Sequence, residues 1–284
     1  MQGKISGFLK IFAKRRIGIA GIIIIIFFVI LAIIAPILPI PSPDYTNPMA
    51  ANIPPSLKYP FGTNGVGENV LSLCIWGSRI SLEVGLAAAA FIVLIGLIIG
   101  MIAGYFGGIL DEVLMRLTDF VLVLPSLVLV IIIGAIYGTS LLNIILIIGM
   151  VSWPRTARIV RSMTLSVREL QFIEATKSIN GSGIYIIFRH VLPNVISVVI
   201  ATGILSVSGS IFMQASMVFL GVGDVTAVSW GQQIEMAFIT GGVVDGFWWT
   251  SFFPGLFLVL LIVGFVFLSI PLEEIFNPKM VRKA

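Results

Sequence analysis

Five long stretches of the chain contain no charged residue, and they limit what the chain can fold into. The whole chain is 58% hydrophobic and only 11% charged, which is too apolar for a water-soluble globular domain. A helix needs roughly 20 apolar residues to cross a bilayer. The sequence therefore predicts an all-α polytopic membrane protein whose spans lie within residues 17–43, 84–110, 120–154, 191–223 and 246–272.

The number of spans depends on how the longer stretches are divided. Residues 120–154 contain a polar hinge, Tyr137-Gly-Thr-Ser140, so they can form two short spans. Residues 191–223 contain no comparable hinge, and we expect one long helix that bends or re-enters the membrane near residues 212–223. These choices predict six transmembrane helices.

The first apolar stretch follows a basic tail that ends in Arg15 and Arg16. A cleaved signal peptide has the same order of basic flank and apolar core. Its core is usually only about 7 to 15 residues long, and a small-residue cleavage site follows it. Because this stretch is longer and no clear cleavage site follows, we predict an uncleaved first transmembrane helix.

The positive charges indicate an orientation in the membrane. With the N-terminus inside, only Lys58 and Arg79 of the 17 Lys and Arg residues fall outside, as the positive-inside rule requires. We therefore predict a protein of the cell (plasma or inner) membrane with both termini in the cytoplasm. The chain then divides into a tail, first transmembrane helix and external segment (1–78), a five-helix core with a cytoplasmic loop at about 155–190 (79–275), and a cytoplasmic C-terminal tail (276–284).

Several functions are disfavoured by what the sequence lacks. The single cysteine, Cys74, excludes an intramolecular disulfide, and the single histidine, His190, excludes a multi-histidine metal site; we expect His190 to make a structural hydrogen bond. The chain has no phosphate-binding loop, no catalytic Ser/His or paired-Asp arrangement, and no acidic residue near the centre of a predicted span. An enzyme or an ion-coupled carrier is therefore disfavoured, and the net charge of +4 follows membrane orientation rather than nucleic-acid binding.

Three patterns within or beside the predicted spans indicate structural roles. Glycines spaced by four at Gly96, Gly100 and Gly104 predict close helix packing. Three tryptophans before the last span predict an aromatic belt at the outer membrane boundary: Trp230, Trp248 and Trp249. Four arginines after the fourth span predict a basic flank in contact with lipid phosphate: Arg155, Arg158, Arg161 and Arg168.

A charged segment separates the fourth and fifth predicted spans. Apolar residues at spacings of three and four predict an amphipathic helix that runs into Glu174, namely Val160, Met163, Val167, Leu170 and Ile173. The run Asn180-Gly-Ser-Gly183 predicts a tight reversal. Leu192-Pro193 should then open the next span, after a second short helix whose apolar stripe is Ile184, Ile187, Phe188 and Val191.

This segment resembles the EAA loop of ATP-binding cassette (ABC) importer permeases. The resemblance rests on Glu174-Ala175-Thr176, on the turn Asn180-Gly181-Ser182, and on the spacing to Leu192-Pro193. In that family the loop is cytoplasmic and inserts into a cleft of the ATP-hydrolysing subunit, where its glutamate pairs with a basic group. Thr176 stands where the family usually has alanine, and Asn180 where it usually has glycine. Asparagine is the non-glycine residue that best tolerates a positive φ.

The resemblance covers most of the chain and is to the second of the two permeases of dipeptide/oligopeptide importers. One departure is Glu68-Asn69, where that family typically has Arg-Asp. The landmarks, in chain order, are Pro60-Phe-Gly-Thr63, Val70-Leu-Ser72, Ala103-Gly-Tyr-Phe-Gly-Gly108, Leu114-Met-Arg-Leu117, Ser152-Trp-Pro154, Arg189-His-Val-Leu-Pro-Asn194, Phe219-Leu-Gly221, Ser229-Trp-Gly231 and Phe253-Pro-Gly255.

The resemblance implies a type I ABC importer permease fold and a non-catalytic transport subunit. Its partners would be a homologous permease, two ATP-binding subunits that bind ATP and magnesium, and an external substrate-binding protein. The implied substrate is a di- or oligopeptide. Nickel and oligosaccharides are alternatives within the family, and a self-sufficient secondary carrier is the alternative outside it. The sequence assigns no cofactor, metal or path-lining residue to this chain.

Overall fold

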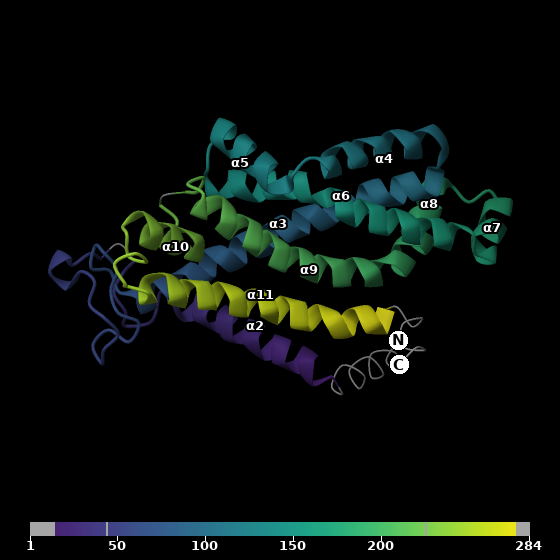
Figure 1. Ribbon diagram of the computed structural model, residues 1–284. Helices are drawn as coiled ribbons and strands as arrows, with labels where there is room; N and C mark the ends of the chain where they lie inside the picture. The colour runs from purple at the N-terminus through teal and green to yellow at the C-terminus, as the bar shows by residue number, and fades with distance from the viewer. Residues whose placement is uncertain (1–14, 44, 225, 277–284) are drawn as a thin grey trace.

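The computed structural model describes residues 15–43, 45–224 and 226–276, with side chains as far as Glu273. Within these ranges the chain forms helices and no β-strand, and Thr63 and Asn69 make one isolated bridge (Figure 1). The predicted all-α class is therefore confirmed. The elements are α2 (Arg16–Ile34), η1 (Pro48–Ala50), α3 (Val70–Phe106), α4 (Gly108–Val123), α5 (Ser126–Tyr137), α6 (Leu141–Arg168), α7 (Gln171–Ser178), α8 (Gly183–Ile186), the π-helical η2 (Ile187–Val191), α9 (Leu192–Phe219), α10 (Trp230–Ile239) and α11 (Trp249–Phe276).

Four helices of the described chain are long and apolar enough to cross a membrane: α2, α3, the continuous α8–η2–α9 and α11. The pair α4 and α5, bent by 89°, makes a fifth if it counts as one span. Helix α6 runs beside α3 along the bundle (Figure 1). The prediction of six spans is therefore not confirmed by length and apolarity alone.

The bundle has two distinct ends (Figure 1). The start of α2, the end of α11 and the short helix α7 lie at one end, which we call the α7 end. The segments 35–43 and 45–69 and α10 lie at the other, the α10 end. The predicted tail 276–284 falls outside the described residues beyond Phe276, as do Lys4, Lys10 and Lys14 of the basic tail.

The break between α5 and α6 falls at the predicted hinge. Helix α5 ends at Tyr137, Gly138 has a φ of 89°, and the Ser140 side chain caps α6 by accepting from the Asn143 N–H at 3.3 Å. A second break, at Leu124 and Pro125, was not predicted. The residue before a proline disfavours the helical conformation, and Leu124 is extended with a ψ of 135°.

Helix α3 begins earlier than the uncharged stretch suggested. The Asn69 side chain caps it by accepting from the Leu71 and Ser72 N–H groups at 3.0 and 3.3 Å. Arg79 and Glu83 therefore lie within the helix, both exposed, and the division drawn between residues 78 and 79 falls inside α3. The uncharged stretch 84–110 is a poor guide to the start of this helix, because an exposed charged side chain does not interrupt a helix. Asn69 also explains one departure from the family, because asparagine and aspartate are equally good N-caps.

The α10 end is held together by buried tryptophans. The Trp230 indole donates to the Cys74 carbonyl at 2.8 Å, and the Trp249 indole donates to the Thr63 carbonyl at 3.0 Å. Both rings are buried, and only Trp248 is exposed. The predicted aromatic belt is therefore wrong for two of its three members, because these rings pack between helices. Helix α9 is unbroken to Phe219, and the chain turns at Gly221, which has a φ of 83° and lies within the predicted window 212–223; α10 was not predicted.

The glycines of α3 lie against the backbone of α6, as predicted. A Cβ added to Gly96 would come within 2.6 Å of the Thr156 Cβ, and one on Gly100 within 2.6 Å of the Ala157 carbonyl oxygen. One added to Gly104 would come within 2.7 Å of the Thr164 Cβ. Real side-chain atoms do not approach this closely, so only glycine permits the contact. The α3–α6 pair forms the most extensive helix contact in the described chain.

We expect Gly100→Val to destabilise the fold. Overpacking of a close contact costs about 1–3 kcal/mol, and here the obstacle is backbone that cannot rotate away. The control is Gly255→Val in α11, where an added Cβ meets nothing within 4 Å. Thermal unfolding in detergent should give a lower midpoint for the Gly100 variant alone, and equal midpoints for the two variants would contradict the packing argument.

Candidate functional site

The segment around Glu174 consists of two short arms joined by an elbow, which we call the α7 loop (residues 169–191). The predicted helix running unbroken into Glu174 is wrong, because α6 ends at Arg168 and α7 begins at Gln171. Leu170 has an extended backbone at this break and is exposed. Ile173 is fully buried, so the first arm is fixed to the bundle on one side.

The elbow is a Schellman turn, and it confirms the predicted reversal. Asn180 has a φ of 59°, its N–H donates to the Lys177 carbonyl at 3.0 Å, and the Gly181 N–H donates to the Thr176 carbonyl at 3.0 Å. The Thr176 hydroxyl donates to the Phe172 carbonyl at 2.8 Å, and a Cβ on Gly181 would lie 2.8 Å from the Thr176 methyl. The departures at Thr176 and Asn180 therefore fit a closed elbow.

The second arm is continuous with the next long helix. The Ser182 side chain caps it by accepting from the Tyr185 N–H at 3.3 Å. The predicted start at Leu192-Pro193 matches the start of α9, but the helix is continuous from Gly183 to Phe219, so this start is not a separate helix end. Pro193 lies in the first turn assigned to α9, directly after the π-helical η2.

The π-helical turn also changes which side chains face the bundle. Ile187 and Val191 are buried as predicted, but Ile184 and Phe188 are 68% and 64% exposed. Ile186 is fully buried in their place. Residues five apart share a face of a π-helix, which brings Ile186 and Val191 together and turns the predicted stripe partly outward.

A buried apolar cluster anchors both arms. Lys177 adds a cation–π contact, its Nζ lying 5.8 Å from the centre of the Tyr105 ring. The His190 ring centre lies 5.7 Å from that of Phe172 and 5.8 Å from that of Tyr185, so this histidine packs between the arms. The cluster consists of Met101, Tyr105, Val160, Val167, Ile173, Ile186, Ile187, Val191, Val195 and Val199. The α7 loop is therefore one rigid projection of α3, α6 and α9.

The outer surface of the loop carries unpaired and apolar groups. Glu174 and Ala175 are exposed, and the Glu174 carboxylate makes no ion pair or hydrogen bond with any residue that the structure describes. Ile179 is 81% exposed, and Ile184 and Phe188 of the same loop are exposed as well. Large apolar side chains grouped on a polar loop are typical of a protein interface.

Three of the four flanking arginines pair within the chain, so the predicted lipid contact is wrong for them. Arg158 pairs with Asp119 of α4. The Arg161 Nε and Nη2 donate to the two carboxylate oxygens of Asp111 at 2.5 and 2.6 Å, and the Arg168 Nη1 donates to the Tyr105 carbonyl at 3.1 Å. These contacts tie α6 to α4 and α3. Arg155 alone of the four has no such partner among the described residues.

A cavity of about 280 Å³ lies beside Arg155, between α3, α4, α5, α6 and α9. Leu122 and Ser126 flank the α4–α5 break at its wall, so the bend of 89° adjoins the cavity. The polar side chains that line it are Ser126, Ser152, Arg155, Thr156, Thr202, Ser206 and Ser210. The hydroxyl groups on α6 and α9 were not predicted to have a role; the signal in the sequence is the recurrence of Ser and Thr in these two helices.

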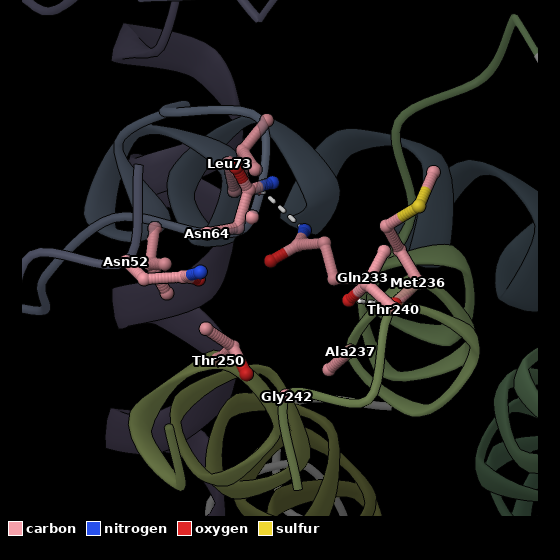
Figure 2. A pocket seen from close by; sticks show the side chains of 11 residues that line it. Asn52, Asn64, Leu73, Gln233, Met236, Ala237, Thr240, Gly242 and Thr250 are labelled. Carbon is pink, nitrogen blue, oxygen red and sulfur yellow. Dashed lines mark hydrogen bonds between the residues drawn. The ribbon is translucent and has the colours of Figure 1, made fainter. Parts of the chain in front are cut away.

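A second cavity, at the α10 end, is too small for a solute (Figure 2). Its volume is about 10 Å³, which is room for about one water molecule. The Gln233 amide projects into it and donates to the Leu73 carbonyl at 2.9 Å. This cavity is therefore a small packing gap where the segment 47–69 contacts α3, α10 and α11.

Two acidic groups near the α10 end have perturbed pKa values. Hydrogen bonds from the Thr226 hydroxyl and N–H lower the pKa of Asp224. Burial raises the pKa of Glu235. Neither group belongs to a metal site, since the described residues contain no cluster of three His, Cys, Asp or Glu that could hold an ion.

Comparison with known proteins defines the class. Residues 96–282 match the family model described as the binding-protein-dependent transport system inner membrane component. Residues 5–55 match the N-terminal TM domain of oligopeptide transport permease C. The chain belongs to this family of ABC transporter permeases. It is therefore a multi-pass membrane protein and a non-catalytic subunit.

The similar proteins bear the names predicted from the landmarks. The dipeptide transport system permease protein DppC of Alkalihalophilus pseudofirmus is 36% identical over 270 residues, covering 94% of this chain and 87% of that protein. DppC of Bacillus subtilis is 34% identical, covering 95% and 84%. The oligopeptide transport system permease protein OppC of Bacillus subtilis is 32% identical, covering 95% and 88%. The predicted family is therefore confirmed.

We expect the Arg161–Asp111 pair to contribute measurably to stability. Its side chains are 33% and 16% exposed, and a hydrogen bond to a charged group contributes about 1.5–3 kcal/mol. Arg161→Ala should lower the thermal midpoint. Arg116→Ala, which removes the exposed 3.9 Å pair with Glu112, should change stability by at most about 0.5 kcal/mol. Similar decreases in the thermal midpoint of both variants would show that the Arg161–Asp111 pair stabilises the fold no more than an exposed pair does.

We expect Asn180→Val to loosen the elbow and Asn180→Gly to preserve it. A β-branched residue at a φ of 59° costs about 1–2 kcal/mol, whereas glycine adopts this conformation freely. Hydrogen–deuterium exchange of the α7 amides should accelerate in the valine variant only. Equal protection in the two variants would argue against the Schellman geometry.

Proposed function

We propose that the chain is the second permease of an ATP-driven importer of di- or oligopeptides. The observation that carries the proposal is the α7 loop, a rigid elbow whose exposed surface presents Glu174 and apolar side chains with no partner in the described chain. The match of residues 5–55 to the permease C domain supports the second-permease assignment. The names of the relatives support a peptide substrate.

The proposed assembly contains a homologous permease, two ATP-binding subunits and an external substrate-binding protein. ATP and magnesium bind to the ATP-binding subunits, which contact the α7 loop in the cytoplasm. Six crossings of the cell membrane, with α6 as the sixth, leave both ends of the chain on that side. The shared position of α7, the start of α2 and the end of α11 supports this orientation (Figure 1).

The proposed coupling passes through the helix that begins in the loop. At 1.5 Å per residue, the 37-residue helix Gly183–Phe219 is about 55 Å long. It contains no break at Leu192 or Pro193, and it lines the cavity with Thr202, Ser206 and Ser210. A displacement of the loop by an ATP-binding subunit is therefore carried directly to the cavity wall.

The test is to purify the tagged chain with its native partners and to compare Glu174→Ala with the control Glu112→Ala. The wild type and the control should retain the homologous partner permease and two ATP-binding subunits. Losing one member of a desolvated interface pair costs about 2–5 kcal/mol, so Glu174→Ala should lose most of the ATP-binding subunits and of the uptake while keeping its thermal midpoint.

Screening the purified binding protein with peptides, nickel and oligosaccharides identifies the solute. A wild-type chain that purifies alone and moves solute without ATP would be a secondary carrier, and the proposed function would then be wrong. Normal uptake by Glu174→Ala would contradict the docking role of the loop while leaving the importer assignment intact.

A further inference from the structure

The cavity beside Arg155 has an unusual supply of free hydroxyl groups. Serine and threonine within helices commonly donate to the carbonyl one turn earlier, and two of the lining residues do so. The Thr202 hydroxyl donates to the Val198 carbonyl at 3.1 Å, and the Ser206 hydroxyl donates to the Thr202 carbonyl at 2.9 Å. These two hydroxyls are therefore satisfied within α9.

The other four hydroxyls, those of Ser126, Ser152, Thr156 and Ser210, make no hydrogen bond within the part of the chain that the structure describes. Thr156 packs its methyl against Gly96. Ser210 is only 2% exposed, and its hydroxyl is fully buried without a partner. Because protein atoms enclose that hydroxyl, the unpaired hydroxyls left open to the cavity are those of Ser126, Ser152 and Thr156.

Arg155 adds an uncompensated positive charge at the same wall. Arg158, Arg161 and Arg168 each use a carboxylate or a carbonyl of this chain, but Arg155 is exposed and uses none that the structure describes. A guanidinium presents a planar fork that matches a carboxylate with two parallel hydrogen bonds. The cavity therefore combines one free cation with neutral hydroxyls.

The helix break strengthens the preference for an anion. Helix α5 starts at Ser126 on the cavity wall, and Pro125 gives it no side-chain cap. The N-terminus of a helix carries a partial positive charge, and broken spans in transporters commonly direct such ends at anionic substrate groups. The three acids of α4, Asp111, Glu112 and Asp119, are already paired with Arg161, Arg116 and Arg158.

We propose that this cavity binds the carboxylate end of the solute as it passes. Arg155 holds the carboxylate, and the free hydroxyls of Ser152 and Thr156 receive neighbouring polar groups. The volume of about 280 Å³ lies just below the range of about 300–1,000 Å³ typical of ligand pockets, so it accepts the end of a peptide rather than a whole oligopeptide. The inference rests on the proposed importer function and names a subsite within its path.

The experiment uses the complete importer in proteoliposomes, with its binding protein, and compares a transported peptide with the same peptide amidated at its C-terminus. The variants are Arg155→Gln, Arg155→Lys and the control Arg116→Gln, which changes an exposed arginine of α4. The measured quantity is the ratio of the free-acid uptake rate to the amide uptake rate. The binding protein is identical in every sample, so a change in this ratio reports on the permease.

We expect Arg155→Gln to lower the ratio about tenfold, Arg155→Lys to restore part of it, and Arg116→Gln to match the wild type. An unchanged ratio in Arg155→Gln would overturn the subsite. If Arg155→Gln slows both peptides equally and loses the homologous partner permease on purification, Arg155 pairs with that partner and the subsite is also wrong. A wild-type complex without ATP-binding subunits or ATP-dependent peptide uptake would instead refute the proposed function itself.

Discussion

The backbone contact between α3 and α6 determines where the functional parts of this permease lie. Glycines at three successive turns of α3 let the two helices approach without side chains between them. The turn of α6 that contacts Gly96 also presents Arg155 and Thr156 to the cavity. Further along α6, Arg161 contributes its carbonyl to the contact at Gly104 and its guanidinium to the pair with Asp111. The position of the cavity and the α4 attachment therefore depend on the same contact.

The α7 loop depends on that contact as well. Tyr105 at the end of α3 and Val167 at the end of α6 belong to the cluster that buries Ile173 and Ile186. The loop is therefore an extension of the paired helices rather than a flexible connection. The π-helical turn joins its second arm to α9 without a hinge, so the loop and one wall of the cavity belong to a single rigid element.

Much of the fold follows from local patterns in the sequence. The apolar stretches correctly predicted the helical class. The run from Tyr137 to Ser140 correctly predicted a helix break, and the run beginning at Asn180 correctly predicted a chain reversal. Each of these depends on backbone preferences of the residues themselves. The spacing of Gly96, Gly100 and Gly104 was equally informative, because a smooth helix face has few other uses.

The errors arose where a distant partner decides the outcome. Trp230 was assigned to the membrane boundary because nothing in its neighbourhood indicates the Cys74 carbonyl that its indole reaches. Arg158 and Arg161 were assigned to lipid because Asp119 and Asp111 lie far away in sequence. The stripe at Ile184 and Phe188 was misplaced because one π-helical turn changes the spacing on which such stripes are counted.

The pairing of α2 with α11 has a consequence for the order of assembly during synthesis. A Cβ on Gly21 would come within 2.7 Å of the Gly264 carbonyl oxygen, so the first and last long helices of the described chain meet backbone to backbone. Among the described helices, α2 is made before the others and α11 after them, and α2 contacts α11 more extensively than any other helix. The main contact face of α2 therefore stays uncovered in the bilayer until α11 has been made, and the described bundle closes only then.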